Sequence, residues 1–338
     1  MDKITKTLIE ELNLKEFQVV NTIKLLDDGN TVPFIARYRK EVTGELSDEI
    51  LRAFSERLEY LRNIEAKKEE ILRLINEQEK LTPEIEKAID EAKTVTELDD
   101  IYRPFRPKRR TRATIAKEKG LEPLAEFLFA QDPSAEAPES YALGFIDSEK
   151  GVETADDALA GAMDIIAEQI SDNADYRKEL RETTYKRAAV TVKNSKDEES
   201  VYEMYYDFSE PCSKIANHRV LAINRGEKEG FLSVKLDMDE EIAEKYLIRE
   251  VTPKNPAPST EYVRLAAVDA YKRLIAPSVE TEIRNLLTDR AQEDAIKVFA
   301  KKLSGLLLQP PIKGQTVLGL DPGYRTGCKA AVVDDTGK

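Results

Sequence analysis

The sequence predicts a mainly α-helical protein, a multi-helix scaffold that ends in the first β-hairpin of a further α/β domain. Two observations carry this prediction. Apolar residues recur at three- and four-residue steps along most of the 338 residues, which is the spacing of one buried helix face. After residue 312 the pattern changes to two short runs of β-branched and small apolar residues with turn residues between them. The length suits two or three domains with buried cores.

Residues 1–80 are predicted to form an N-terminal helical region that resembles a helix-turn-helix. Leu25 to Gly29 has the pattern of a helix end with a glycine stop, and Pro33 follows at the start of the next helix. A longer helix is predicted over 47–80, because Ser47 and Asp48 form a start signal. Helix pairs of this kind are common packing units, so the pattern alone does not assign DNA binding.

Residues 81–255 are predicted to be a central helical region. Hydroxyl caps predict three helix starts there: Thr82 before Pro83, Thr94 with Glu97, and Thr154 with Asp157. The stretch from Tyr185 to Leu236 mixes β-branched, aromatic and charged residues, and its pattern predicts no single element. The proline-rich segment from Val251 to Ser259 is a candidate connector between domains.

Residues 256–312 are predicted to be a helical segment that packs back on the scaffold. Helices are expected at 259–275, 278–287 and 289–308. The last of them should end before Pro310 and Pro311, because proline lacks the amide hydrogen that a helix interior needs.

Residues 313–338 are predicted to start a truncated α/β domain. Gln315 to Asp321 has the pattern of a strand, Pro322 to Gly327 that of a turn, and Cys328 to Val333 that of a second strand. A two-stranded hairpin is marginal alone and leaves unpaired edges. We therefore expect the chain to be a fragment of a longer protein, cut inside this domain.

Charge and composition exclude several classes of protein. The longest apolar runs fall short of the roughly 18 residues that a membrane span needs, and the N-terminus begins as an amphipathic helix without an apolar signal core. Two cysteines and one histidine are too few for a disulfide framework, a zinc knuckle or a His-rich metal site. A cytoplasmic protein without a metal or other cofactor and without a membrane partner is expected.

A basic segment, residues 101–119, stands out from the acidic chain. It holds 8 basic residues against Glu118 alone, a charge of +7 that leaves −20 for the rest of a chain whose net charge is −13. Pro104 and Pro107 prevent a regular helix there, so the arginines should lie on an extended loop. Guanidinium groups bind phosphates, and Tyr102 or Phe105 could stack on bases. The alternative is that carboxylates of the same chain neutralise the loop.

A second basic cluster surrounds Tyr38 in the N-terminal region. The candidate nucleic-acid-binding residues of both segments are Arg37, Arg39, Lys40, Arg103, Arg106, Lys108, Arg109, Arg110 and Arg112. Neither segment indicates sequence-specific recognition, and the choice between RNA and DNA stays open. The single histidine, His218, is expected to be structural.

Asp321 is a candidate for chemistry because it lies beside glycines at a predicted strand end. An aspartate in this place opens the active site of ribonuclease-H-like nucleases, where it shares two metal ions with later acids. It could also belong to a phosphate loop of the kind found in actin-like ATPases, although Tyr324 and Arg325 stand where small residues are usual. As a structural residue it would cap the tight turn at Pro322. No catalytic residue is assigned in this chain.

Four segments together resemble the family of bacterial transcription accessory protein Tex: Val32 to Glu41, Tyr102 to Arg112, His218 to Glu227, and Val317 to Asp334. The resemblance runs through the whole chain and implies a cytoplasmic nucleic-acid-binding protein of transcription or RNA metabolism. It implies that a YqgF-type ribonuclease-H-like domain, degenerate as a nuclease, continues past residue 338, with Asp321 as a vestigial acid. Helix-hairpin-helix elements and an RNA-binding OB-fold would follow.

Three hypotheses for function result. The first is the non-catalytic N-terminal part of a Tex-like factor whose basic loop contacts phosphate, with RNA or DNA bound mainly through the absent modules and the transcription machinery as a further partner. The second is a resolvase-type nuclease or phosphate-loop ATPase whose remaining active-site residues lie beyond the fragment. The third is a scaffold whose acidic helices dock a protein partner.

Overall fold

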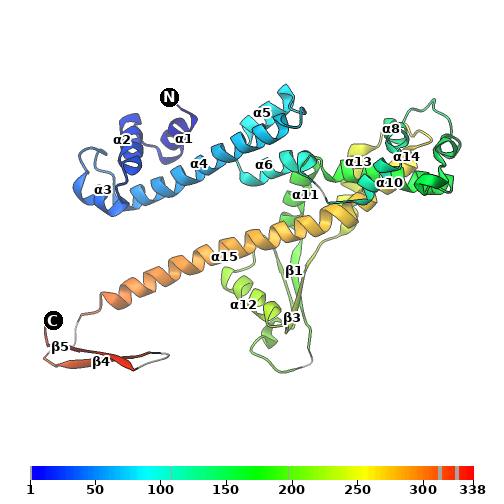
Figure 1. The fold of residues 1–338 in the computed structure, drawn as a ribbon. Coiled ribbons are helices and arrows are strands. Elements are labelled where there is room, and N and C mark those ends of the chain that lie inside the picture. The colour runs from blue at the N-terminus through cyan, green and yellow to red at the C-terminus, as the bar shows by residue number, and fades with distance from the viewer. Residues whose placement is uncertain (1, 108, 197, 311–313, 324–326) are drawn as a thin grey trace. The chain divides into compact units, whose positions relative to one another are not determined.

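The computed structural model is mainly α-helical, as the sequence predicts, and describes residues 2–107, 109–196, 198–310, 314–323 and 327–338 (Figure 1). Contacts divide the chain into two units. The first contains the chain up to Glu182 together with Glu240–Pro277, and the second contains Thr183–Asp239 and Ser278–Lys338. Within the described residues, no helix combines the length and the apolar character that crossing a membrane requires.

The first unit begins with four helices whose apolar faces share small cores. They are α1 (Lys3–Leu12), α2 (Glu16–Asp27), α3 (Val32–Tyr38) and α4 (Asp48–Asn76). The Ser47 hydroxyl accepts the Ile50 amide at 3.2 Å, which confirms the predicted start of the long helix. Phe54 and Leu58 of α4 pack against α1 and α2, and Leu51 packs against Ile35 of α3. The predicted glycine stop is also present, since Gly29 has a φ of 80° just after α2.

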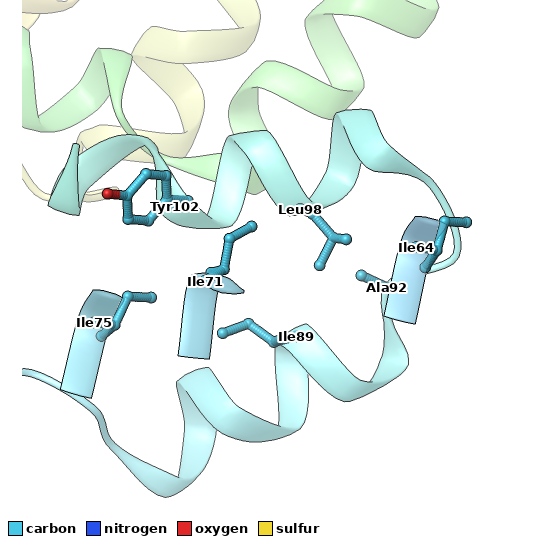
Figure 2. Close-up of a cluster of buried hydrophobic side chains, with 7 residues drawn as sticks. All are labelled: Ile64, Ile71, Ile75, Ile89, Ala92, Leu98 and Tyr102. Carbon is cyan, nitrogen blue, oxygen red and sulfur yellow. The ribbon is translucent and has the colours of Figure 1, made fainter. Parts of the chain in front are cut away.

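The far end of α4 packs against α5 (Pro83–Glu91) and α6 (Val95–Tyr102). Figure 2 shows the cluster that joins them: Ile64, Ile71, Ile75, Ile89, Ala92, Leu98 and Tyr102. Thr82 and Thr94 cap the two helices as predicted. The capping box at Thr94 is only half formed, because the Glu97 carboxylate accepts the amide of Lys93 at 2.9 Å instead of that of Thr94.

The rest of the first unit is organised around α10 (Ala155–Ser171), which contacts α7, α8, α9 and α14. Ile165, Ile166 and Ala167 are fully buried. The capping box predicted at Thr154 is complete, with both reciprocal bonds to Asp157. The remaining elements of this unit are η1 (Arg103–Phe105), α7 (Arg112–Glu118), α8 (Glu122–Ala130), α9 (Pro138–Ala142), η2 (Leu143–Phe145), η3 (Ser148–Lys150), α11 (Ala174–Arg187, which ends in the second unit), α13 (Glu240–Val251), α14 (Thr260–Asp269) and the π-helical η5 (Ala270–Ile275).

The proline-rich connector at residues 252–259 lies inside the first unit. Helices α13 and α14, on its two sides, pack against each other, so contacts do not divide the chain there. The ranges 1–80, 81–255, 256–312 and 313–338 remain predictions of sequence organisation, whereas the contact units follow the packing.

The second unit contains a three-stranded antiparallel sheet for which the sequence analysis made no prediction. Its strands are β1 (Ala189–Asn194), β2 (Asp207–Pro211) and β3 (Leu232–Asp237), in the order β2-β1-β3. The short helix η4 (Glu203–Tyr205) precedes β2, and α12 (Asn217–Lys228) packs on β3. Val190 and Val192 alternate with more exposed residues, so one face of β1 is buried.

The prediction of two helices, at 278–287 and 289–308, is wrong. The structure has a single helix there, α15 (Ala276–Leu307), which continues directly from η5. Thr288 and Asp289 do not break it, since neither residue lacks an amide hydrogen or requires an unusual backbone angle. The helix ends before Pro310, as predicted.

The predicted C-terminal hairpin is confirmed by the strands β4 (Val317–Pro322) and β5 (Cys328–Val333), which pair antiparallel with Asp321 opposite Lys329. The Gly323 amide donates to the Gly327 carbonyl at 2.9 Å across the turn. Tyr324 and Arg325, which stand where a phosphate loop usually has small residues, lie outside the described residues.

Candidate nucleic-acid interface

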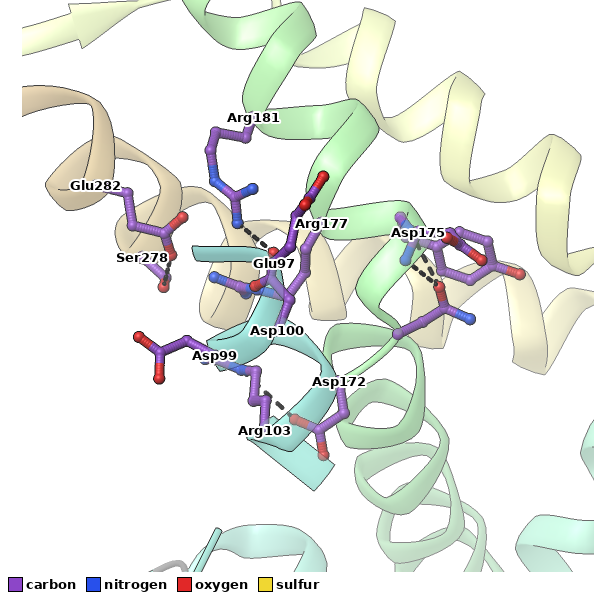
Figure 3. A network of polar contacts seen from close by, with 12 residues as sticks. Glu97, Asp99, Asp100, Arg103, Asp172, Asp175, Arg177, Arg181, Ser278 and Glu282 are labelled. Atoms are coloured by element: carbon purple, nitrogen blue, oxygen red, sulfur yellow. Dashed lines mark hydrogen bonds and ion pairs between the residues drawn. The ribbon is translucent and has the colours of Figure 1, made fainter. Parts of the chain in front are cut away.

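The predicted basic loop begins on a buried ion cluster that joins α6 to α11. The Asp100 carboxylate accepts from Arg177 at 3.0 Å and from Arg181 at 2.6 Å. The Arg177 side chain is fully buried and that of Asp100 is 7% exposed. Figure 3 shows both guanidinium groups around this carboxylate. Because paired charges hold each other in place when they are desolvated, this cluster fixes the end of α6 from which the loop leaves.

The prediction that the arginines of residues 101–119 lie on an extended loop holds only between η1 and α7, because Arg103 lies in η1 and Arg112 begins α7. Three arginines of this segment form ion pairs with the chain's own carboxylates. Arg103 lies 3.6 Å from Asp172, with its Nε facing Oδ1 (Figure 3). Arg106 pairs with Asp99 at 3.1 Å, and Arg110 pairs with Glu118 at 2.9 Å. The last two pairs are more than 40% exposed on both sides, and such surface pairs contribute only about 0–1 kcal/mol each. A phosphate can therefore replace their carboxylates at little cost.

The other predicted residues of the loop are exposed to solvent where the structure describes them. Arg109 and Arg112 are exposed, and neither forms a direct ion pair with any described residue. Lys108 lies outside the described residues. The alternative of internal neutralisation thus accounts for part of the loop, while the described arginines of residues 106–112 all keep their guanidinium groups at the surface.

The two aromatic residues of the loop pack against the α4–α6 core to different extents. Tyr102 is 8% exposed and belongs to the core cluster of Figure 2. Phe105 is half-buried against the same cluster, and its carbonyl accepts from Gln78 at 2.9 Å. The expectation that Tyr102 could stack on a base is therefore wrong, because its ring belongs to the α4–α6 core, whereas stacking on the half-buried Phe105 stays a prediction.

The second basic cluster is carried by α3 and the residue pair after it. Arg37, Arg39 and Lys40 are exposed, and none has an ion pair in the part of the chain that the structure describes. Tyr38 is 59% exposed; the Arg37 guanidinium lies 6.0 Å from the centre of its ring. Arg39 lies 5.2 Å from the Phe34 ring. An exposed aromatic ring between cations is the composition of a base-stacking site.

The two basic clusters are separate sites. α3 packs at Leu51 near the start of α4, whereas the loop base packs near Ile75 at the other end. At 1.5 Å per residue these positions lie about 36 Å apart along the helix. The structure therefore does not bring Arg37, Arg39 and Lys40 together with the loop arginines.

Asp321 lies on the exposed strand β4, in the row of residues paired with β5. Among the described residues, no group of three or more His, Cys, Asp or Glu side chains is placed to hold a metal ion. Asp334 accepts from Thr336 and from the Lys338 amide, so its carboxylate stabilises a turn. His218 lies in the first turn of α12 and lines a groove with residues of α15.

Family models match three parts of the chain. Residues 2–76 match the Tex-like protein N-terminal domain, residues 132–299 the Tex central region, and residues 315–338 the Tex protein YqgF-like domain. The segment between the first two matches contains the basic loop.

Curated relatives match along almost the whole chain. It is 45% identical to protein YdcI of Bacillus subtilis over 99% of this chain and 47% of that protein. It is 40% identical to the transcriptional accessory protein Tex of Neisseria gonorrhoeae, over 99% of this chain and 45% of the relative. The S1 RNA-binding domain-containing protein 1 of Homo sapiens is 32% identical over 98% of this chain and 35% of its own length. The chain thus spans about half the length of the bacterial relatives it matches, and it belongs to the Tex family of transcription accessory proteins.

Proposed function

We propose that this chain is a non-catalytic, nucleic-acid-contacting scaffold of a Tex-type transcription factor, and that its basic loop binds backbone phosphates. The exposed arginines of residues 106–112 on an otherwise anionic chain are the observation that carries the proposal. The relatives named for transcription and for an S1 RNA-binding domain support it. Two free cysteines suit a cytoplasmic location, where thiols stay reduced.

Binding at the loop would exchange weak surface ion pairs for phosphate contacts. Arg109 and Arg112 can meet a phosphate directly, and Arg106 and Arg110 can leave Asp99 and Glu118 at a cost of about 0–1 kcal/mol each. Each phosphate contact on a duplex releases counterions and adds about −0.9 to the slope of log K against log salt. With few contacts available, the affinity of this chain should be low and strongly dependent on salt.

The second cluster on α3 would supply a further contact. The positions on α4 against which α3 and the base of the loop pack, Leu51 and Ile75, lie about 36 Å apart along the helix, which is close to the roughly 34–36 Å of one duplex turn. Arg37, Arg39 and Lys40 would bind phosphates there, and Tyr38 offers a ring for an unpaired base. This arrangement favours extended nucleic acid over short oligonucleotides.

The test is a fluorescence anisotropy titration with a labelled single-stranded RNA and a labelled duplex DNA at two salt concentrations. Neutralising the loop in the variant Arg109→Gln, Arg110→Gln, Arg112→Gln should weaken binding and reduce the salt slope by about two to three. The matched control is Arg52→Gln, Arg249→Gln, Arg264→Gln, which removes the same charge from exposed arginines paired with neighbouring acids. Equal losses in both triple variants would show that the effect is net charge alone and would contradict a binding loop.

The non-catalytic part of the proposal has its own test. We expect neither Mg²⁺-dependent cleavage of branched or single-stranded substrates nor ATP turnover that depends on Asp321. Both assays should be run on this chain and on a longer chain that continues into the YqgF-like domain, each with its Asp321→Asn variant. Cleavage or turnover that disappears in that variant would establish the enzymatic alternative.

A further inference from the structure

The first unit contains a groove that the proposed phosphate contacts do not use. Its volume is about 550 Å³, within the roughly 300–1,000 Å³ of typical binding pockets. α5 forms one wall, the start of α11 forms the other, and α6 with η1 lies between them. The apolar lining includes Ile85, Ala88, Ile101 and Phe105, all of them half-buried. This floor keeps part of its apolar surface open to solvent.

Carboxylates surround that floor. Six of the described lining residues are acidic and one, Lys178, is basic. The acidic residues are Glu84, Glu91, Glu97, Asp100, Asp172 and Asp175. Figure 3 shows Glu97 of α6, Asp172 in the turn after α10 and Asp175 of α11 in the same region. The groove therefore combines an apolar base with a negative rim.

Three of these carboxylates are already occupied by the chain's own cations. Asp100 is held by two arginines, Glu97 pairs with Lys178 at 2.8 Å, and Asp172 lies beside Arg103. The other three are exposed. Glu91 has only a long contact of 3.9 Å to Lys87, and Glu84 and Asp175 form no ion pair within the described part of the chain. Negative charge at the rim thus remains for a ligand.

The chemistry of the groove selects its ligand. A phosphate backbone would be repelled by the rim, and the described residues offer no group of three or more metal-binding side chains. A ligand that fits must bring positive charge for the rim and an apolar group for the floor. We propose that this groove binds a linear cationic segment of a partner protein, in which lysine or arginine residues flank an aliphatic or aromatic anchor.

In this complex the anchor would lie on Ile85, Ile101 and Phe105, and the flanking cations would reach Glu84, Glu91 and Asp175. Burial of the anchor supplies most of the affinity, while the rim charges accelerate association and make it sensitive to salt. Arg103 and Arg106 of the adjoining basic loop would repel the cationic segment on that side. The segment should therefore run along α5 and the start of α11, away from the phosphate-binding loop.

The experiment measures binding of a short fluorescent peptide in which Lys and Arg flank a central Leu-Leu pair to the whole 338-residue chain. The comparison peptide carries Glu at each basic position. The variant Glu84→Gln, Glu91→Gln, Asp175→Asn should lower the affinity for the basic peptide roughly five- to thirtyfold, which is about 1–2 kcal/mol in total for three exposed pairs. The matched control Glu126→Gln, Glu136→Gln, Glu153→Gln removes the same charge elsewhere on the unit and should leave the affinity within about twofold.

A second variant tests the apolar floor without changing charge. Ala88→Phe places a ring over the groove and should abolish binding of the peptide, while circular dichroism shows an unchanged helix content. Affinity for RNA should stay the same in Ala88→Phe, which changes no charge, so this inference and the proposed phosphate contacts can fail separately. Equal binding of the two peptides, or equal affinity of the two triple variants, would overturn the proposal. So would concentration-dependent dimerisation that the groove variants abolish, because a second copy of the chain would then be the occupant.

Discussion

The Asp100 carboxylate positions the start of the basic loop, although Asp100 itself is not one of the proposed phosphate-binding residues. It lies between Arg177 and Arg181, and through them it ties the end of α6 to α11. Asp100→Asn removes the negative charge that the fully buried Arg177 faces, and loss of one partner of a buried ion pair costs about 3–5 kcal/mol. Urea unfolding should therefore show a much lower midpoint for this variant.

The control lies next to it in the sequence. Asp99 pairs with Arg106 in a pair that is about half exposed, so Asp99→Asn should cost less than about 1 kcal/mol. If Asp99→Asn and Asp100→Asn had the same midpoint, the buried cluster would not stabilise the first unit as the structure indicates.

The two cysteines should differ sharply in reactivity. Burial raises the pKa of the Cys212 thiol to about 11, whereas Cys328 is exposed on β5. Brief iodoacetamide treatment of the native chain at pH 8 should give a single adduct, at Cys328, by mass spectrometry. Two adducts would appear only after unfolding in urea. Labelling of Cys212 in the native chain would contradict the packing around β2.

The same shift predicts a dependence of stability on pH. A thiol whose pKa is raised from 9.0 in the unfolded chain to about 11 in the folded chain stabilises the fold fully below pH 9, and this contribution is lost as pH rises through 11. Between pH 9 and 11 the wild type should therefore lose about 2 kcal/mol relative to Cys212→Ala in urea unfolding. A constant difference between the two proteins would contradict this assignment.

The sequence locates the basic clusters well, but it does not show which of their aromatic side chains are exposed to solvent. The basic residues of both clusters are evident from the sequence, but whether Tyr38 or Tyr102 faces solvent depends on what packs against each ring. Tyr102 meets α4 residues that lie some 30 positions earlier, and Tyr38 has no comparable cover. Asp100, Arg177 and Arg181 come together from positions 77 and 81 residues apart, and no local pattern indicates such a cluster.

At the scale of elements, local signals determined what could be predicted. Ser47, Thr82 and Thr154 start helices where their spacing indicates, because a cap depends only on the next few residues. The sheet β2-β1-β3 could not be predicted from local patterns, because its pairing of Val190 with Leu236 joins segments 46 residues apart. α15 was divided wrongly into two helices because its apolar residues do not keep to one face, although its backbone is continuous.

Two glycines in helices should respond to alanine in opposite ways. A methyl group at Gly161 of α10 would lie well inside van der Waals contact with Leu121, which is itself buried. Gly161→Ala should destabilise the protein by about 1–2 kcal/mol. Overpacking of the core costs about 1–3 kcal/mol, which exceeds the roughly 1 kcal/mol gained from the higher helix propensity of alanine. Gly305→Ala in α15 meets open space and should be neutral or stabilise by up to about 1 kcal/mol. Thermal unfolding shows whether each variant is more or less stable than the wild type. A higher melting temperature for Gly161→Ala would show that Leu121 can move aside.

At the scale of the whole molecule, the chain combines a net charge of −13 with a local surplus of +7. Whether the net charge or the local charge dominates the interaction with a nucleic acid depends on the range of electrostatic interactions in the solution. At about 0.1 M salt the Debye length is about 10 Å, so an oligonucleotide near residues 106–112 senses mainly the loop. At about 0.01 M the Debye length is about 30 Å, and repulsion by the acidic remainder is felt as well.

This change of range predicts a bend in the salt dependence of binding. Between about 0.2 and 0.1 M salt, log K should rise as salt falls, with a slope set by about three phosphate contacts at roughly −0.9 each. Below about 0.03 M the slope should flatten, because the −20 outside the loop opposes further attraction. Glu126→Gln, Glu136→Gln, Glu153→Gln removes three exposed negative charges outside residues 101–119 and should raise affinity at low salt while leaving the high-salt values unchanged. A straight line over the whole range, identical in this variant, would mean that the loop is too strongly screened from the rest of the chain for its net charge to matter.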